Sequence, residues 1–217
     1  MATIHNSDFM TDPRFQSAYA AGMSTGSWAG CDPQWGAYIA CWAAESVLRL
    51  DGDFVECGVN RGGLARTILG FVDLPSSGKK FYLFDTFEGL VQRYLTPEEE
   101  KNGITAGGFE PCYDEVVRTF SQFGNTVVLV KGAVPDTLAA SAPEKVAYLS
   151  IDMNCVNPEI AAAEFFWPRM VRGAIMLLDD YGWARHAAQK QGFDRFAQER
   201  GVLILSLPTG QGLIMKL

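Results

Sequence analysis

Basic residues and long apolar runs are both scarce in this sequence. Its 217 residues include 18 Lys and Arg against 25 Asp and Glu, which gives a formal net charge of −7. A nucleic-acid-binding surface needs a basic stripe, and no run of five or more basic residues exists. No apolar run approaches the roughly 20 residues that a membrane-spanning helix needs. We therefore expect a protein with no nucleic-acid partner and no membrane segment.

Cysteine and histidine are too few and too scattered to build a disulfide scaffold or a zinc site. The five cysteines are widely spaced, and none forms a Cys-x-x-Cys pair. We expect buried, reduced thiols in a cytoplasmic protein. The first ten residues have no apolar core and do not resemble a secretory signal. Only two histidines are present: His5, which we do not expect to take part in chemistry, and His186.

Apolar segments that alternate with amphipathic ones define the expected architecture. The strand candidates are 54–58, 81–84, 126–130, 146–151, 174–179, 202–206 and 212–216. The helix candidates are 35–49, 64–72, 112–123, 134–140, 158–170 and 186–200. Such alternation forms βαβ units, whose strands are parallel and covered on both faces. The link 208–212 holds no helix, so the last two strands should pair antiparallel. The sequence thus predicts a Rossmann-like, seven-stranded, mostly parallel α/β sheet with helices on both faces and an antiparallel C-terminal hairpin.

Local signals place two helix ends and one helix start. Asn157 is expected as an N-cap, with Pro158 at the first helical position and Glu159 in an acidic first turn. Pro168 should end this helix near Trp167. Gly201 should cap the last helix at its C-terminus.

The length fits one domain over residues 1–217. Within it we expect a helical, lid-like extension at 1–50 and a ligand-binding core at 52–217. The first 34 residues read as irregular structure with one short helix. The segment 88–111 is too long for an ordinary connection between a strand and a helix, and we expect it to be a lid or a binding loop.

The most informative stretch is an apolar strand candidate that runs into a glycine-rich turn. Residues 54–63 contain Glu56, Gly58 and Gly62 at the spacing Glu-x-Gly-x-x-x-Gly. A strand, such a turn and a helix typically bind a nucleotide-like ligand. The spacing is neither that of a dinucleotide fingerprint nor that of a triphosphate loop. Because Glu56 would repel a pyrophosphate, it favours a ligand with a cationic end, such as S-adenosylmethionine with its ammonium and sulfonium groups.

Acidic residues follow most of the predicted strands, at the edge where open parallel sheets bind ligands. Asp85 ends the second strand, where it can either contact ribose hydroxyls or cap the turn at 86–88, and the sequence leaves both interpretations open. Asp152 ends the fourth strand, and Asp179 and Asp180 end the fifth. Three carboxylates from neighbouring strands repel one another unless a cation joins them, and hard oxygen ligands favour Mg²⁺. The alternative is that these three are solvated strand-end caps.

Four motifs together resemble the macrocin O-methyltransferase family over about residues 52–217. They are the turn at 52–63, the segment 84–90 (Phe-Asp-Thr-Phe-Glu-Gly-Leu), Lys131-Gly132 with 136–138, and 175–182, which ends in Asp-Asp-Tyr-Gly. The resemblance implies a class I methyltransferase that uses S-adenosylmethionine and Mg²⁺ to methylate sugar hydroxyls of macrolide and aminocoumarin antibiotics. It implies Asp152, Asp179 and Asp180 as metal ligands. The expected cofactor contacts are Glu56, Cys57, Gly58, Asn60, Arg61, Gly62, Asp85, Thr86 and Gly132.

One position departs from the family pattern. These sugar methyltransferases carry Asp-x-Asp after the fourth strand, where the second Asp is a proposed general base, whereas this chain has Asp152-Met153-Asn154. An amide cannot take a proton, although it can ligate a metal or orient a hydroxyl. We expect Asp152, Asn154 and His186 to form the catalytic set. In this mechanism the metal lowers the pKa of the acceptor hydroxyl. Either His186 acts as the general base in place of the missing carboxylate, or the metal-bound oxygen needs no base.

The resulting hypothesis is a metal-dependent O-methyltransferase that acts on a hydroxyl of a small molecule, either a sugar or a glycosylated natural product. The alternatives are a catechol-type O-methyltransferase acting on a vicinal phenol, and a non-catalytic S-adenosylmethionine-binding relative. Glu56 and the glycine spacing disfavour NAD binding. We expect a homo-oligomer in the form of a dimer, and an acceptor pocket built from residues 1–35 and 88–111.

Overall fold

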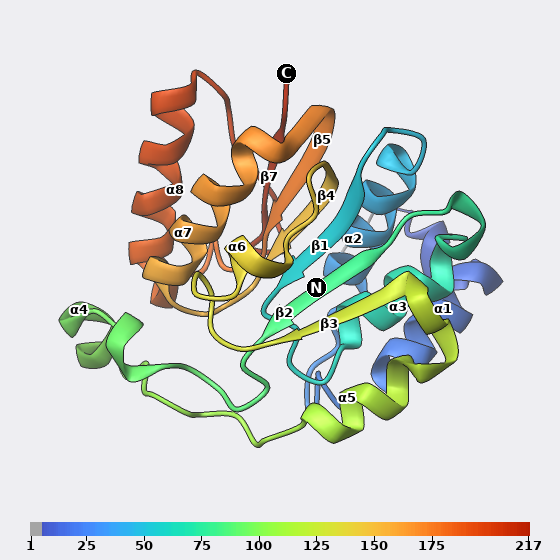
Figure 1. The fold of residues 1–217 in the computed structure, drawn as a ribbon, viewed down its shortest axis with the longest axis horizontal. Helices are drawn as coiled ribbons and strands as arrows, with labels where there is room; N and C mark the ends of the chain where they lie inside the picture. The colour runs from blue at the N-terminus through green and yellow to red at the C-terminus, as the bar shows by residue number, and fades with distance from the viewer. Residues whose placement is uncertain (1–5) are drawn as a thin grey trace.

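A twisted seven-stranded sheet forms the centre of the molecule. The computed structural model describes residues 6–217, so His5 lies outside the described residues. The strands are β1 (Asp53–Cys57), β2 (Phe81–Asp85), β3 (Val127–Lys131), β4 (Val146–Ile151), β5 (Met170–Leu178), β6 (Leu205–Ser206) and β7 (Gly212–Met215). Their order is β3-β2-β1-β4-β5-β7-β6 (Figure 1). The first five are parallel, β7 pairs antiparallel with β5, and β6 pairs antiparallel with β7. The predicted sheet and its C-terminal hairpin are therefore confirmed.

Helices cover both faces of this sheet, as predicted. One face carries α1 (Pro13–Met23), α2 (Gln34–Val47), α3 (Gly63–Phe71) and α5 (Tyr113–Phe120), and the other carries α6 (Leu138–Ser141), α7 (Val156–Phe166) and α8 (Ala187–Arg200). The short α4 (Pro97–Lys101) lies apart from both layers, in the long loop between β2 and α5 (Figure 1). The 3-10 segments between residues 6 and 217 are η1 (Asp8–Thr11), η2 (Pro75–Ser77), η3 (Gln92–Tyr94), η4 (Ser121–Thr126), η5 (Trp167–Arg169) and η6 (Ala184–His186).

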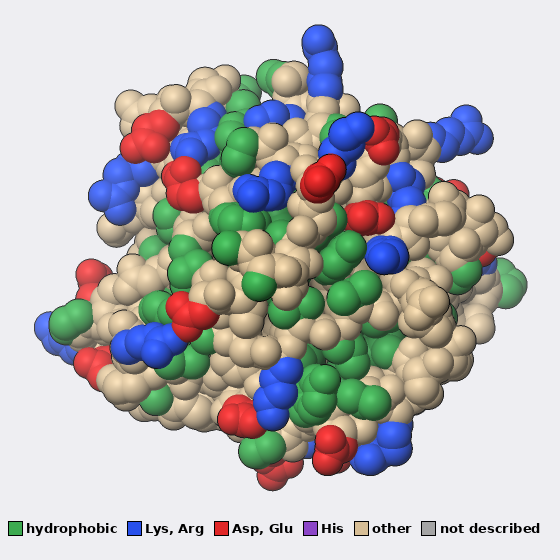
Figure 2. All heavy atoms as spheres, viewed as in Figure 1, with side chains coloured by type: hydrophobic (Ala, Val, Ile, Leu, Met, Phe, Trp, Pro, Cys, Tyr) green, Lys and Arg blue, Asp and Glu red, His purple; other side chains and the backbone are tan. Residues whose placement is uncertain are grey.

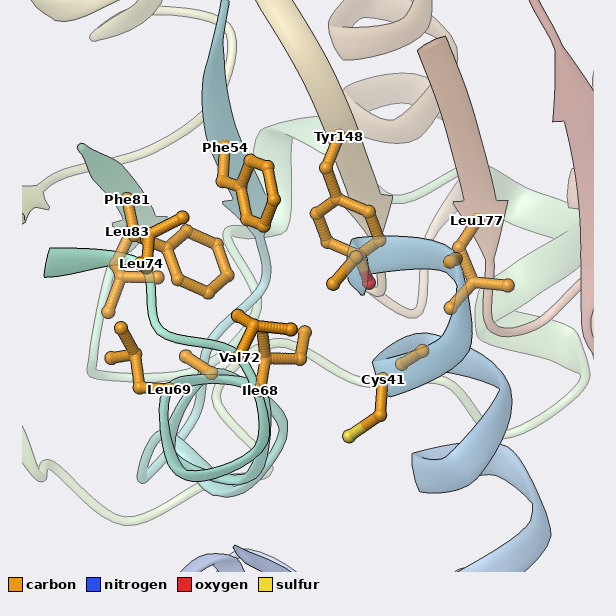
Figure 3. Close-up of a cluster of buried hydrophobic side chains, with 14 of the residues drawn as sticks. Cys41, Phe54, Ile68, Leu69, Val72, Leu74, Phe81, Leu83, Tyr148 and Leu177 are labelled. Atoms are coloured by element: carbon orange, nitrogen blue, oxygen red, sulfur yellow. The ribbon is translucent and has the colours of Figure 1, made fainter. Parts of the chain in front are cut away.

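Apolar side chains fill a core on each face of the sheet. Phe81, Phe54, Tyr148 and Leu177 project from four neighbouring strands toward α2 and α3 (Figure 3). A second core packs the opposite face of the same strands against α7 and α8. This two-sided burial explains why the strands read as nearly continuous apolar runs in the sequence. No helix of the described part is long and apolar enough to cross a membrane. All five cysteines are unpaired, and one of them, Cys31, is exposed where we expected buried thiols.

The start of α7 differs from the prediction. The helix begins at Val156 with Cys155 as its N-cap, so Asn157 is not the cap. The cause lies outside the helix, because the carboxylate of Glu99 accepts a hydrogen bond from the Val156 N–H at 2.6 Å. Pro158 is tolerated at the third helical position, since N–H groups in the first turn have no partner within the helix. The cap is therefore supplied by a distant residue that no local signal reveals.

Other ends agree with the prediction or shift for local reasons. Pro168 follows the last residue of α7, and Gly201, with a φ of 62°, caps α8, both as predicted. β5 begins earlier than expected because Met170 already pairs with β4. β6 is shorter, since only Leu205–Ser206 pair with β7. The helix predicted at 112–123 ends sooner as α5 and continues as a 3-10 segment.

The N-terminal segment is more regular than expected. An 11-residue helix, α1, begins at Pro13, and Asp12 caps it by accepting a hydrogen bond from the Arg14 N–H at 2.8 Å. The Asp-Pro pair is a helix-start signal that was present in the sequence. Phe15 of α1 is buried in the core on the α3 side. The described part of residues 1–50 is therefore packed into the molecule. The loop after α1 contacts the start of α3, where the hydroxyl of Ser27 accepts a hydrogen bond from the Gly63 N–H at 2.8 Å.

Candidate active site

A cleft of about 790 Å³ lies at the carboxyl ends of the parallel strands. Residues that follow β1, β2, β4 and β5 form its floor, and its walls come from 27–37 and from the long loop after β2. In Figure 1 this loop runs below the sheet, from α4 to α5. The two regions that we expected to build an acceptor pocket therefore line the same cleft as the strand ends.

The glycine turn after β1 brings the ends of β1 and β4 together. Gly58 has a φ of 89°, and a Cβ at this position would lie 1.7 Å from the carbonyl oxygen of Asp152. Beside it, the Asp152 N–H donates to the carbonyl oxygen of Cys57 at 2.8 Å. Glycine is thus required both by the backbone angle and by the close approach of the two strand ends. This approach places Asp152 beside any ligand that the turn holds.

Asp85 holds the glycine turn from the neighbouring strand. Its Oδ2 accepts hydrogen bonds from the N–H groups of Val59 (2.5 Å) and Asn60 (2.7 Å), and its Oδ1 accepts one from the Phe87 N–H (2.6 Å). Asn60 has a φ of 51°, a conformation that is strained for a residue other than glycine and is frequent at functional sites. Asp85 thus caps its own turn and also fixes the turn after β1. Its contact with ribose stays a prediction.

Three further residues from the predicted cofactor set, Glu56, Thr86 and Gly132, line the cleft. Glu56 is only 2% exposed, and its Oε2 has no hydrogen-bond partner in residues 6–217. Burial raises its pKa well above the usual range, and the charges of Asp85 and Asp179 add to this effect. A buried, unpartnered carboxylate oxygen at a cleft surface fits the cationic donor group of a ligand.

The other three predicted cofactor residues shape the cleft from outside. The side chain of Cys57 is buried in the core on the α7 side. Arg61 forms ion pairs with Glu110, at 3.1 Å, and with Glu115, so it ties the long loop and α5 to the glycine turn. Gly62 caps the start of α3 with a φ of 86°. None of these three side chains lines the cleft.

Asp152, Asp179 and Asp180 converge at one end of the cleft. One carboxylate oxygen from each lies within 4.8 Å of the others. Burial raises the pKa of all three carboxyl groups. Neighbouring carboxylates raise the pKa of Asp152 further, and the charge of Asp179 helps to raise the pKa of Asp180 to about 7. Oδ1 of Asp179 accepts a hydrogen bond from Gln211 at 2.9 Å, whereas Oδ2 of Asp180 is buried without a partner among the described residues. An all-oxygen donor set with an unpartnered buried oxygen fits a hard divalent cation such as Mg²⁺.

Two residues beyond β4 organise this cluster. Asn154, with a φ of 56°, donates from Nδ2 to Oδ1 of Asp152 at 2.7 Å. Glu159, in the first turn of α7, is 1% exposed and accepts a hydrogen bond from the Met153 N–H at 3.1 Å. Burial and the charge of Asp180 raise the pKa of Glu159 well above its usual range. The sequence showed Glu159 only as a helix-start residue, so its place beside the cluster was missed.

His186 lies behind the cluster and does not line the cleft. Its Nε2 is 3.6 Å from Oδ1 of Asp180, and its Nδ1 is 2.8 Å from Nε2 of Gln189. With the Gln189 amide as donor to Nδ1, the neutral imidazole carries its proton on Nε2 and directs it at Asp180. Burial, followed by the charge of Arg185, lowers the pKa of His186 and favours this neutral form. The geometry thus favours a residue that orients Asp180 over one that touches the acceptor.

Glu99 fastens the long loop beside the cleft, and the sequence analysis did not identify it. It is 2% exposed, and its two oxygens accept hydrogen bonds from the N–H groups of Val156 (2.6 Å) and Thr96 (2.8 Å). Arg185 adds a second tie by donating to the carbonyl oxygen of Gly103 at 2.8 Å. Thr96 and Glu99 form a capping box, a Thr-x-x-Glu pattern from which α4 could have been predicted.

The sheet order, the glycine turn and the cleft are those of a Rossmann-like methyltransferase. The model of the family described as Macrocin-O-methyltransferase (TylF) matches residues 40–204, which is most of the sequence. The chain belongs to this family.

Two curated relatives are similar over 155 residues each. One, 26% identical, is the 8-demethyl-8-(2,3-dimethoxy-alpha-L-rhamnosyl)-tetracenomycin-C 4'-O-methyltransferase of Streptomyces olivaceus, and the match covers 64% of this chain and 58% of that protein. The other, 27% identical, is the mycinamicin III 3''-O-methyltransferase of Micromonospora griseorubida, with 63% and 59% covered. The chain therefore spans less than two thirds of the length of either relative.

Solved structures show the same fold at low sequence identity. The O-methyltransferase NovP superposes with a TM-score of 0.75 at 15% identity, covering 97% of this chain and 99% of NovP. The apo structure of CalS11, a TDP-rhamnose 3'-O-methyltransferase, gives 0.60 at 18% identity, with 98% and 96% covered. An O-methyltransferase from Bacillus cereus in complex with SAH gives 0.59 at 11% identity, with 99% and 94% covered. These TM-scores establish a shared fold.

Proposed function

We propose that this chain transfers the methyl group of S-adenosylmethionine to a sugar hydroxyl of a glycosylated natural product, with the help of a divalent metal ion. One observation carries the proposal: the cluster of Asp152, Asp179 and Asp180 lies in the same cleft as the glycine turn after β1. A methyl donor held by the turn and a hydroxyl held at the carboxylates would share one cavity. Family membership and the two relatives support this assignment, since both relatives are named as O-methyltransferases and the name of the first includes a rhamnosyl group.

The residues around the turn fit S-adenosylmethionine, which supplies an electrophilic methyl group when bound. The unpartnered Oε2 of Glu56 suits an ammonium donor, and it disfavours a pyrophosphate. Asp85 fixes the N–H groups of Val59 and Asn60, so the turn is held in shape before a ligand enters. If Asp85 also accepts a hydrogen bond from the ribose, its two oxygens do so in addition to the three bonds that they accept from backbone N–H groups. Preorganisation of this kind lowers the cost of ordering the loop on binding.

The acidic cluster fits a divalent ion, which lowers the pKa of a hydroxyl that it contacts. Asp152, Asp179 and Asp180 would hold the ion. Their orientation is fixed by neighbours that do not need to touch the metal: Asn154 for Asp152, Gln211 for Asp179 and His186 for Asp180. The first two are hydrogen bonds, and the third is a contact of 3.6 Å. Residues that surround a metal site in this way commonly set both its affinity and the direction of its ligands.

The side chains of the cleft position the acceptor oxygen and leave it few places to send its proton. Asn154 cannot accept a proton, and His186 is separated from the cleft by Asp180. The remaining acceptors in reach are the cluster carboxylates and water in the cleft. Most of the rate acceleration would then come from holding the donor methyl and the acceptor oxygen in line.

Methyl transfer from isotope-labelled S-adenosylmethionine to a panel of glycosides and catechols tests this function. We expect transfer to a sugar hydroxyl that stops with EDTA and returns with Mg²⁺. Asp179→Asn should abolish transfer while S-adenosylhomocysteine still binds. Glu144→Gln, an equal charge change at an exposed residue two positions before β4, should have no effect. Full activity without metal would contradict the metal site. Transfer only to vicinal phenols would favour the catechol-type alternative, and cofactor binding without any transfer would favour the non-catalytic one.

A further inference from the structure

The charged side chains that line the cleft are all acidic. Among residues 6–217 no Lys, Arg or His lines it, whereas seven acidic residues do. Five of these belong to the turn and the cluster already described, and the other two, Asp32 and Glu110, are exposed side chains of the walls. A ligand with phosphate groups needs cationic side chains or a helix N-terminus directed at it. The lining of this cleft supplies no cationic side chain.

Three basic residues near the cleft are paired with carboxylates. Arg61 binds Glu110 and Glu115, Lys131 binds Glu88 at 2.8 Å, and Arg93 binds Asp136. Arg185 has no carboxylate partner among the described residues, but it is held outside the lining by its hydrogen bond to the carbonyl oxygen of Gly103. The face shown in Figure 2 has the same character, because its Lys and Arg side chains are interspersed with Asp and Glu. None of these four basic side chains is therefore free to swing into the cleft.

Asp32 differs from the other wall residues because it has no cationic partner. Its carboxylate accepts hydrogen bonds from the hydroxyl of Tyr19 at 2.6 Å and from Gln34 at 3.0 Å. No Lys, Arg or His of the described residues lies within ion-pair distance of it. Both of its partners are neutral, so its negative charge remains available at the cleft wall.

Large aromatic side chains complete the walls. Trp183, beside the acidic cluster, is 55% exposed, and Phe109, on the long loop, is 42% exposed. Trp28 and Trp35 line the cleft from the segment that also carries Asp32. Aromatic faces attract both apolar bodies and cations. A wall of aromatic rings and carboxylates therefore suits an apolar molecule with a positive charge.

We propose that the acceptor carries a basic amine and no phosphate or carboxylate, so that it is an amine-bearing glycoside and not a nucleoside-diphosphate sugar or an acyl-CoA ester. This rests on the proposed function, because it describes the acceptor of that same site. A divalent ion would bind at the cluster, the ammonium group of S-adenosylmethionine suits Glu56, and Arg61 already pairs with Glu110. Asp32 has no cationic partner in any of these arrangements, and it is the carboxylate that we assign to the amine.

Equilibrium binding to the protein loaded with S-adenosylhomocysteine and Mg²⁺ tests the proposal without requiring turnover. The probes are 4-nitrophenyl glucosaminide, its N-acetylated counterpart and UDP-glucose, measured by calorimetry. We expect the amine to bind at least tenfold more tightly than the N-acetyl compound, with the difference reduced in 0.5 M salt because exposed charges are screened. We expect no binding of UDP-glucose at concentrations up to about 1 mM, as for a ligand that the site does not recognise.

Two variants locate the effect. Asp32→Asn should remove most of the preference for the amine, while Glu144→Gln, the same charge change at the opposite edge of the sheet, should preserve it. Equal binding of the amine and the N-acetyl compound, tighter binding of UDP-glucose, or no binding of the amine at millimolar concentration would each overturn the proposal. Binding of S-adenosylhomocysteine and labelled methyl transfer are measured separately, so failure of the methyltransferase assignment is distinguished from failure of the acceptor assignment.

Discussion

The side-chain amide of Asn154 donates a hydrogen bond to Oδ1 of Asp152 across 2.7 Å. This pair stands where the family pattern places two acids, and the amide replaces a repulsive contact with an attractive one. Asp152 is thereby held in place without a metal, and the charge of the cluster is reduced by one. The asparagine cannot act as the general base that is proposed for the family. It does hold the carboxylate of Asp152 in place before a metal binds.

Asn154→Asp should therefore lower the stability of the metal-free protein and strengthen its binding of Mg²⁺. In EDTA the variant loses a hydrogen bond to a charged group and gains a repulsion, so we expect a loss of about 1–3 kcal/mol in the free energy of unfolding. With Mg²⁺ the added charge should tighten the site, so the rise in Tm on adding the metal should exceed that of the natural sequence. Asn125→Asp, the same change at an exposed position in η4, serves as the control. An equal Mg²⁺ response in all three proteins would show that position 154 does not face the metal.

The metal-free protein should lose stability as the pH rises toward neutrality. The pKa of Asp180 is about 7 in the folded chain, against about 3.9 when unfolded. Between these values the folded state binds a proton that the unfolded state does not, so stability is highest below about pH 4 and falls until about pH 7, by roughly 4 kcal/mol at most. Urea unfolding in EDTA from pH 5 to 8 measures this. In Asp180→Asn this contribution is absent, and the pKa values of Asp152 and Glu159, which the charge of Asp180 raises, should fall as well. Stability should therefore fall less steeply with pH in the variant than in the natural sequence, and equal slopes in the two proteins would contradict the prediction.

Asp85→Ala should weaken cofactor binding through the turn. Removing three charge-assisted hydrogen bonds frees Val59, Asn60 and Phe87, so we expect S-adenosylhomocysteine to bind about 1–3 kcal/mol more weakly. Asp85→Asn can keep only part of the set and should give a smaller loss. Calorimetry measures both. An unchanged dissociation constant for the alanine variant would show that Asp85 is only a turn cap and does not contribute to cofactor binding.

Glu159 should matter for the metal although it is outside the three-residue ligand set. Glu159→Gln keeps its size and an acceptor for the Met153 N–H, but it removes a carboxyl group that can ionise beside Asp180 when a cation is bound. We expect the half-saturating Mg²⁺ concentration to rise about tenfold, as is common for residues that surround a metal site, with little change in cofactor affinity. Glu164→Gln, on the exposed face of the same helix, is the control. If Mg²⁺ dependence is the same in both variants, Glu159 has only a structural role.

The sheet and the strand-end residues could be predicted because their signals are local. A buried strand must be apolar on both faces, and glycine must stand at residue 58, where a Cβ would collide with the end of β4. Contacts between distant segments left no such signal. The cap of α7 comes from Glu99, 57 residues earlier, and the orientation of Asp179 depends on Gln211, 32 residues later. His186 was correctly placed near the cluster by its spacing from Asp180, but the sequence could not show which side of that carboxylate it occupies.

His186 provides the sharpest test of how the acceptor loses its proton. As a general base it would create the acidic limb of the pH–rate profile, and His186→Ala would abolish that limb. The structure favours the other outcome, because Nε2 directs its proton at Asp180 and Gln189 occupies Nδ1. We therefore expect His186→Ala to raise the Mg²⁺ requirement about tenfold while the acidic limb persists at saturating metal. Gln189→Leu should give a milder version of the same change, since it frees the imidazole to rotate away from Asp180. Loss of the acidic limb at saturating Mg²⁺ in His186→Ala, with the limb intact in Gln189→Leu, would restore the histidine as the base.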